Sequence, residues 1–152
     1  MTPEDLEAVT ELLGRPPRGD CEVVTRTPGG APVVLRNAPR LADHTPMPTL
    51  YWLVGKAERE AVSRLEAAGG VKRAERSIDP ESIADAHARY AAERDAELDS
   101  TDQAPRPSGG VGGTRRGVKC LHAHVAWWLA GGDDPVGRWA AGELGLKRED
   151  YR

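Results

Sequence analysis

Two short runs of strand-forming residues, separated by a turn, constrain the fold of this chain more than any other feature. The first run is CEVVTRT, the second is APVVLRN, and Pro28, Gly29 and Gly30 lie between them. Valine and threonine favour strands, and a short connection rich in proline and glycine favours a tight turn. The sequence therefore predicts an antiparallel β-hairpin over residues 21–37.

The rest of the chain predicts one further strand and several helices. TLYWLV, residues 49–54, has strand composition. Thr2, Asp79 and Asp134 each stand directly before a proline, which is typical of a helix start. Helices are expected over residues 2–13, 56–68, 79–98, 117–130 and 134–144. The predicted fold class is α+β, a small three-stranded antiparallel sheet (hairpin plus one strand) packed with four to five helices.

Length, charge and cysteine content restrict the class of protein. A chain of 152 residues is long enough for a single domain with its own core. A net charge of −3 gives no general attraction to nucleic acid, and no segment is apolar enough for a membrane. The acidic start does not resemble a signal peptide, and two cysteines are too few for a disulfide framework. We expect a cytoplasmic protein with a flexible Pro/Gly/Arg-rich loop at residues 99–117.

The segment GVKCLHAHVAWWLAGG, residues 117–132, places Cys120, His122 and His124 within five residues. On a strand all three would face one side, as zinc ligands would. Its alanines favour a helix, on which five apolar residues share an arc of about 100°, the width of a core-facing face: Val118, Leu121, Val125, Trp128 and Leu129. Trp127 lies off this arc, where it packs on a neighbouring helix or on a partner. On a helix His122 lies about 160° around the axis from Cys120 and His124. The pair Cys120 and His124, four residues apart, is then the candidate metal site, with zinc as the candidate ion.

Three interpretations of Cys120 remain open from the sequence. It is a metal ligand together with His124, a buried apolar residue beside a hydrogen-bonded histidine, or a reactive thiol. A position in the first turn of a helix, near Arg115, Arg116 and Lys119, would favour a catalytic thiolate. No oxyanion donor or third orienting residue can be assigned, so the sequence does not establish an enzyme.

The glycine-rich approach to this helix suggests an anion site. SGGVGGTRRGVK does not match the phosphate loop of nucleotide hydrolases, because Val118 separates Gly117 from Lys119. Free N–H groups at a helix start, with arginine and lysine nearby, nevertheless form a site for phosphate. Arg36, at the end of the second strand, and Arg40, in the loop after it, would add bidentate contacts.

The stretches APRLADHTPMPTLYWL, SRLEAAG and VKCLHAH, with DPVG after LAGGD, resemble the actinobacterial domain-of-unknown-function family 501. The matching residues are Arg40, Asp43, Pro48, Thr49, Leu50 and Tyr51 in the first stretch and Lys119, Cys120, Leu121 and His122 in the third. His44 and Met47 depart from the family pattern, Cys21 belongs to none of its motifs, and His124 is less typical of it than His122. The resemblance implies a pocket between the segment at residues 40–51 and the start of the helix at residue 119, and a link to cell division or phosphate metabolism.

These observations give three hypotheses. The first is a small protein that binds an anionic, phosphate-bearing small molecule through Arg40, Asp43, Tyr51, Lys119 and His122. The second is a metal- or thiol-dependent enzyme that uses Cys120. The third is an interaction module that presents Trp127 to a protein partner or to a second copy of itself, which predicts an exposed apolar patch.

Overall fold

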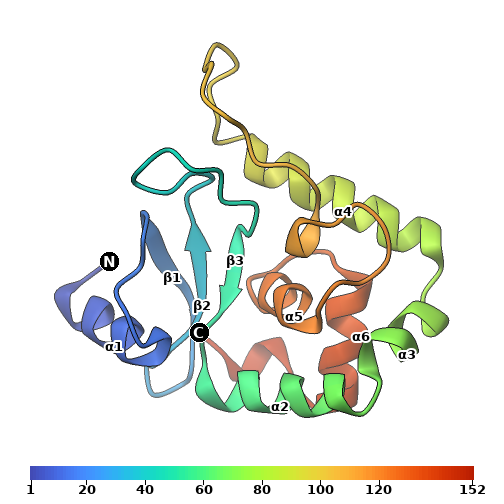
Figure 1. Ribbon diagram of the computed structural model, residues 1–152. Helices are drawn as coiled ribbons and strands as arrows, with labels where there is room; N and C mark the ends of the chain where they lie inside the picture. Colours follow the sequence, from blue (N-terminus) through green and yellow to red (C-terminus); the bar gives the residue numbers. More distant parts are fainter.

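The computed structural model describes all of residues 1–152 and has the predicted α+β architecture. Figure 1 shows a small sheet between α1 on one side and a group of helices around α5 on the other. The elements are α1 (Pro3–Leu13), β1 (Cys21–Arg26), β2 (Pro32–Asn37), β3 (Tyr51–Leu53), α2 (Lys56–Ala67), α3 (Gly70–Ser77), α4 (Pro80–Asp95), the 3₁₀ turn η1 (Val111–Gly113), α5 (Leu121–Leu129), α6 (Pro135–Leu144) and the 3₁₀ turn η2 (Arg148–Asp150).

The predicted hairpin and third strand form one antiparallel sheet in the order β1-β2-β3. Val23 faces Leu35 across β1 and β2, and Leu35 faces Trp52 across β2 and β3. The central strand β2 is buried along most of its length because helices cover the sheet on both faces. Its Leu35 packs in a small cluster with Val9 of α1, whereas Val34 belongs to the main core.

Capping side chains define three of the helix starts as the sequence predicts. The Thr2 side chain accepts a hydrogen bond from the Asp5 amide at 3.1 Å. Asp79 and Asp134 act in the same way at the starts of α4 and α6, with a proline at the first helical position of each. A side-chain oxygen at this position satisfies an amide that has no partner within the helix.

The structure has six α-helices, one more than the predicted four to five, because residues 70–77 form α3. Gly69, with φ 81°, ends α2 in the left-handed conformation, and Gly70 begins the next helix immediately. A Cβ atom on Gly70 would lie 2.6 Å from the carbonyl oxygen of Leu65. The pair Gly69-Gly70 therefore makes a tight corner between two helices, whereas its composition suggests only a helix end.

α5 is buried almost all around its axis, not along one stripe. Trp127 is only 2% exposed, and its ring packs edge-on against Tyr90. Trp128, which the sequence places in the core, lies at the boundary with the Arg148 guanidinium 4.5 Å from its ring centroid. Trp127 therefore packs on a neighbouring helix, one of the two alternatives that its place off the apolar arc allows, whereas the full burial expected of Trp128 is wrong. A helix with neighbours on several sides has no single apolar face.

The segment at residues 99–117 projects beyond the end of α4 and returns to the core (Figure 1). Arg40 pairs with Asp102 and donates to the carbonyl oxygens of Ala104 and Pro105. His87 accepts a hydrogen bond from the Val111 amide at Nδ1, at 3.0 Å, so that Nε2 donates to the carbonyl oxygen of Gly117. Arg40 thus holds residues 102–105 of the segment, and His87 holds residues 111 and 117. The flexibility of the segment stays a prediction.

His87 makes both of its hydrogen bonds to this segment with a neutral imidazole, because Nδ1 accepts and Nε2 donates. We therefore expect acid, which protonates the imidazole, to destabilise the protein. Burial is the main cause that lowers the pKa of His87, and the adjacent His124 ring lowers it further, against opposing effects of Gly117 and Asp134. Between this lowered pKa and the unfolded value of about 6.5, the unfolded state binds more protons than the folded state. The free energy of unfolding should therefore fall as the pH decreases below about 6.5.

Urea unfolding of the wild type and of His87→Gln between pH 8 and pH 5 measures this contribution. The wild type should lose more stability than the variant over that range. Equal slopes for the two proteins would show that another group carries the pH dependence.

None of the helices combines the length and hydropathy that a membrane span requires.

Candidate functional site

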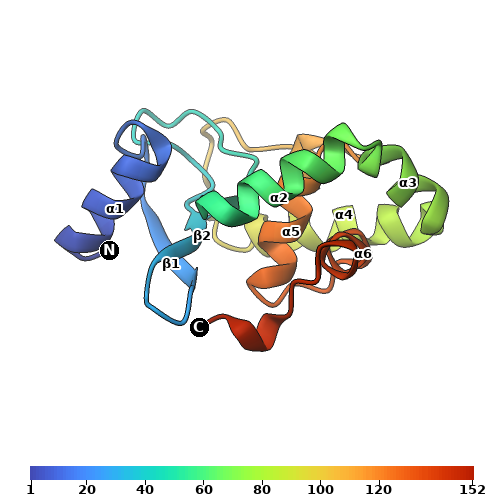
Figure 2. The same ribbon diagram turned by 90° about the horizontal axis from the view of Figure 1, so that it is seen from below.

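Three side chains with metal-binding atoms meet where the end of α2 approaches the start of α5. One ligand atom each from Glu66, Cys120 and His122 lies within 4.8 Å of the other two. Figure 2, viewed from below, shows α2 crossing close to α5, which brings residues about 55 positions apart in the chain into contact. All three side chains are partly exposed, so the cluster is accessible from solvent.

Glu66 organises the cluster through both of its carboxylate oxygens. Oε2 accepts a hydrogen bond from the Leu121 amide, the first N–H of α5, at 2.7 Å. Oε1 lies 3.2 Å from Nδ1 of His122. A carboxylate at a helix start satisfies an unpaired amide and interacts favourably with the helix dipole. Glu66 therefore fixes the start of α5 and orients the imidazole of His122.

The second nitrogen of His122 lies 3.2 Å from the hydroxyl oxygen of Ser63. Ser63 precedes Glu66 by three residues on α2, and side chains at this spacing share one face of a helix. With Nδ1–H directed at Glu66, Nε2 accepts from the Ser63 hydroxyl. Both ring nitrogens of His122 are thus held by α2.

Cys120 is the N-cap residue of α5, and the prediction that it lies in the first helical turn is wrong. Its backbone is extended, with φ −151° and ψ 154°. The rotation of 100° per residue applies only from Leu121 onward, so it does not separate the side chain of Cys120 from that of His122. The fold consequently brings Cys120 and His122 together.

His124, the other predicted metal ligand, has a different environment. Its side chain is buried, and Nδ1 lies 2.7 Å from Oδ2 of Asp134, the residue that caps α6. Its ring centroid is 5.8 Å from that of His87. The cluster of potential ligands therefore contains the predicted Cys120 but not His124, which connects α5 to the start of α6.

The five predicted anion-binding residues are dispersed. Arg40 is engaged with the segment at 102–105. Asp43 is exposed, and hydrogen bonding from the Thr45 side chain, then from the Thr45 amide, lowers the pKa of Asp43 below its usual value. The Tyr51 hydroxyl donates to Glu93, and burial is the main cause that raises the pKa of Tyr51 to about 12. Only Lys119 and His122 adjoin Cys120, since the structure uses the other three within its own loops and sheet.

The backbone amides near the start of α5 have carboxylate partners from the protein itself. Glu66 accepts from the Leu121 amide, and Glu75 of α3 accepts from the Val118 amide at 3.4 Å. An anion at the helix start would have to displace these carboxylates. The sequence does not reveal them, because both lie more than 40 residues away along the chain, and Glu75 belongs to α3, a helix that the sequence does not predict.

A groove of about 620 Å³ runs along α2 to the cluster, and sequence reasoning missed it. Its lining residues are charged or polar: Lys56, Arg59, Glu60, Ser63, Arg64 and His122. The α2 residues among them recur at intervals of three and four, the spacing of one helical face. That periodicity is visible in the sequence, but the contribution of His122 from α5 is not.

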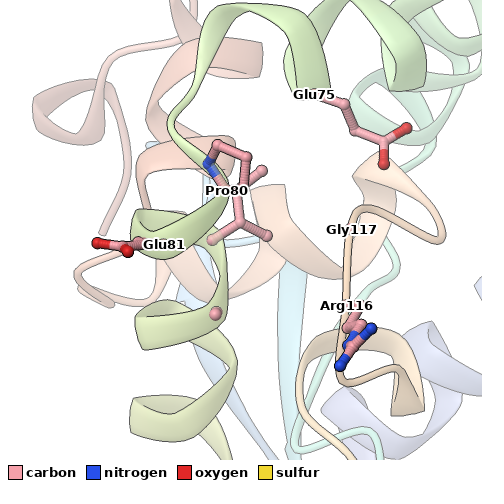
Figure 3. Close-up of a pocket in the computed structure, with 7 residues that line it drawn as sticks. Glu75, Pro80, Glu81, Arg116 and Gly117 are labelled. Atoms are coloured by element: carbon pink, nitrogen blue, oxygen red, sulfur yellow. The ribbon is translucent and has the colours of Figure 1, made fainter.

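A second cavity, of about 310 Å³, lies between α3, the first turn of α4 and the loop before α5. In Figure 3, Pro80 and Glu81 of α4 lie opposite Arg116 and Gly117 of the loop, and Glu81 points away from the loop. Gly117 has φ 61°, and a Cβ atom there would lie 2.6 Å from Oε2 of Glu75. None of the predicted site residues lines this cavity.

Comparison with known proteins identifies a family but no function. No curated protein matches the chain. No solved structure matches it either. The sequence model of one family, described as "Protein of unknown function (DUF501)", matches residues 23–142, which include Glu66, Cys120 and His122. Because the match covers most of the chain, the protein belongs to this family.

Proposed function

We propose that the protein binds a divalent metal ion, with zinc the preferred ion, through Glu66, Cys120 and His122. The observation that carries this proposal is the approach of a carboxylate oxygen, a thiol sulfur and an imidazole nitrogen to within 4.8 Å of one another. Tetrahedral zinc, with bonds of about 2.0–2.3 Å, requires ligand atoms roughly 3.5 Å apart. The side chains of Glu66 and His122 are partly exposed, so they have room to turn toward that separation.

The chemistry of the donor set favours zinc over other common ions. Calcium and magnesium prefer oxygen ligands, whereas zinc accepts sulfur, nitrogen and oxygen together. In the metal-bound form Nδ1 of His122 would lose its proton to become the ligand, and Nε2–H would then donate to the Ser63 hydroxyl. That contact and the Leu121 amide that holds Glu66 are of the kind that orient metal ligands in proteins. These contacts support a site that is largely arranged before the ion binds.

Three protein ligands leave one coordination position of a tetrahedral ion open. Open positions are typical of catalytic zinc, whereas structural zinc sites have four protein ligands. When bound, the ion would supply Lewis acidity to the group at this position. The anionic small molecule that the sequence predicts would bind there, with Lys119 and His122 beside it. Whether a reaction follows is a separate question from metal binding.

Elemental analysis of untagged protein purified without chelators tests the proposal. The wild type should contain one equivalent of zinc, and Cys120→Ser should contain almost none. Cys21→Ser, which removes the chain's other free thiol, is the matched control and should retain the ion. Zinc-free wild-type protein that also fails to bind added zinc would overturn the proposal.

The same side chains support a second candidate, a thiol-dependent enzyme. Nδ1 of His122 is oriented by Glu66, and a ring nitrogen of His122 lies within 4.8 Å of the Cys120 sulfur. An imidazole oriented by an acid is the usual partner of a nucleophilic thiol. Metal-free protein in which Cys120 is alkylated much faster than Cys21, with the rate lowered by His122→Gln, would favour this candidate.

The interaction module predicted from the sequence has less support. It depends on exposed Trp127, which is buried and donates from Nε1 to Glu93. The large exposed apolar side chains are Met1 and Leu6, both near the N-terminus. A protein partner or a homodimer contact would therefore have to use another surface.

A further inference from the structure

The cations of the α2 groove have no acidic partners within the protein. The ion pairs of the structure use other arginines, among them Arg26, Arg36 and Arg94, whereas Lys56, Arg59 and Arg64 belong to none. Glu60 is the only acid that lines the groove. A concentration of unpaired positive charge in a protein of net charge −3 is a local feature that attracts anions.

Arg59 has an incomplete set of hydrogen bonds. Its NH2 group donates to the carbonyl oxygen of Leu12 at 3.2 Å, which fixes the guanidinium between α1 and α2. Its Nε–H is buried and has no partner. An unpaired buried donor is costly. Arg59 also lines the groove, so a turn of its guanidinium toward a bound acceptor there would remove that cost.

We infer that this groove binds the phosphate group of a small phosphate ester. The inference rests on the proposed function in one respect, since His122, one of the residues that would hold the ion, also lines the groove. Three cations and one acid give the groove a net positive charge. A phosphate group, with a charge of about −1.5 to −2, balances that charge more closely than the single negative charge of a carboxylate does. Arginine presents planar forks of N–H donors that fit phosphate oxygens.

The size of the groove favours an ester over phosphate alone. A volume of about 620 Å³ is within the range of small-molecule sites, roughly 300–1,000 Å³, and exceeds the volume of one phosphate group. With the phosphate at Lys56, Arg59 and Arg64, the remainder of the molecule extends toward His122 and the metal ion. This assigns to α2 the anion recognition that the sequence places at residues 40–51 and 117–119.

Calorimetric titration with glycerol 3-phosphate tests the inference. The double variant Lys56→Gln/Arg64→Gln should bind this probe about tenfold more weakly than the wild type, because two charge-assisted contacts are lost. The matched control is Lys72→Gln/Arg76→Gln, which removes the same charge from exposed positions of α3 outside the groove. Its affinity should change less than about threefold, and glycerol should not bind.

Zinc content measured on the same samples separates this inference from the proposed function. Zinc-loaded wild type that does not bind glycerol 3-phosphate would overturn the groove inference and leave the metal site intact. An equal loss of affinity in both double variants would overturn it as well, since the attraction would then be unspecific. If the protein holds no zinc but only the groove variant loses affinity, the metal site fails and the groove is confirmed.

Discussion

Replacing Glu66 by glutamine should lower the affinity for zinc on the order of a hundredfold while α5 keeps its start. The amide oxygen of glutamine can still accept the hydrogen bond from the Leu121 amide, which Glu66 accepts at 2.7 Å. It lacks the negative charge that a metal ligand contributes. Loss of an outer-shell partner alone costs 10- to 100-fold in metal affinity, and loss of a direct ligand costs at least as much. Competition with a chromophoric chelator measures the affinity.

Glu75→Gln is the matched control for this experiment. Glu75 also receives a backbone amide, that of Val118, but it lies outside the cluster of Glu66, Cys120 and His122. Its replacement should leave zinc affinity within about twofold, because local effects without a lost ligand are small. Cobalt substitution adds a spectroscopic test, since a cobalt–thiolate bond absorbs in the near ultraviolet and should be absent from Cys120→Ser. If the two glutamine variants bind zinc equally well, Glu66 is only a cap of α5.

The second large effect is expected at Arg94, where replacement by methionine should lower the free energy of unfolding by about 3–5 kcal/mol. The side chain is fully buried and donates to the carbonyl oxygens of Pro48, at 3.1 Å, and Gly109, at 2.9 Å. It also pairs with the carboxylate of Asp95 at 2.9 Å. Methionine fills similar space but removes the donor of both partly buried carbonyls. Arg94 therefore joins the segment before β3 to the segment before η1.

Arg89→Met provides the control on the same helix. Arg89 is largely exposed and contacts the exposed Asp133, an ion pair of 3.8 Å. Exposed pairs contribute about 0–1 kcal/mol, so this variant should remain close to the wild type. Chemical denaturation monitored by tryptophan fluorescence compares the two. A loss below about 1 kcal/mol in Arg94→Met would show that water or neighbouring groups satisfy the two carbonyls.

Local sequence patterns were sufficient for much of the secondary structure. The hairpin forms because valine-rich runs surround Pro28-Gly29-Gly30, and helix starts follow Thr2, Asp79 and Asp134 because each supplies a capping oxygen within three residues. These interactions need no distant partner. α3 was missed because the same glycine pair that ends a helix also permits an immediate second one.

The candidate site shows the opposite case. The sequence identified Cys120 and His122 as chemically notable, but regular helix geometry assigned Cys120 to His124 instead. Because Cys120 is the extended N-cap residue and not part of the helix, its side chain lies beside His122 and not beside His124. A sequence pattern locates helix boundaries less reliably than the helix itself. Glu66 and Ser63 have no local signal, since an acid and a serine on an exposed helix face are ordinary.

From its sequence alone, the protein is determined to be an α+β chain with one sheet, capped helices and a polar, chemically distinctive start to α5. These properties arise from neighbours in the chain, whose propensities and spacing act within a few residues. Only the tertiary structure decided that α2 crosses the start of α5 and that Glu66 contacts both Leu121 and His122. It also decided that Arg40 pairs with Asp102 and that Tyr51 donates to Glu93. Such contacts depend on core packing over 40 residues or more, and periodicity along one helix carries no information about the helix that packs against it.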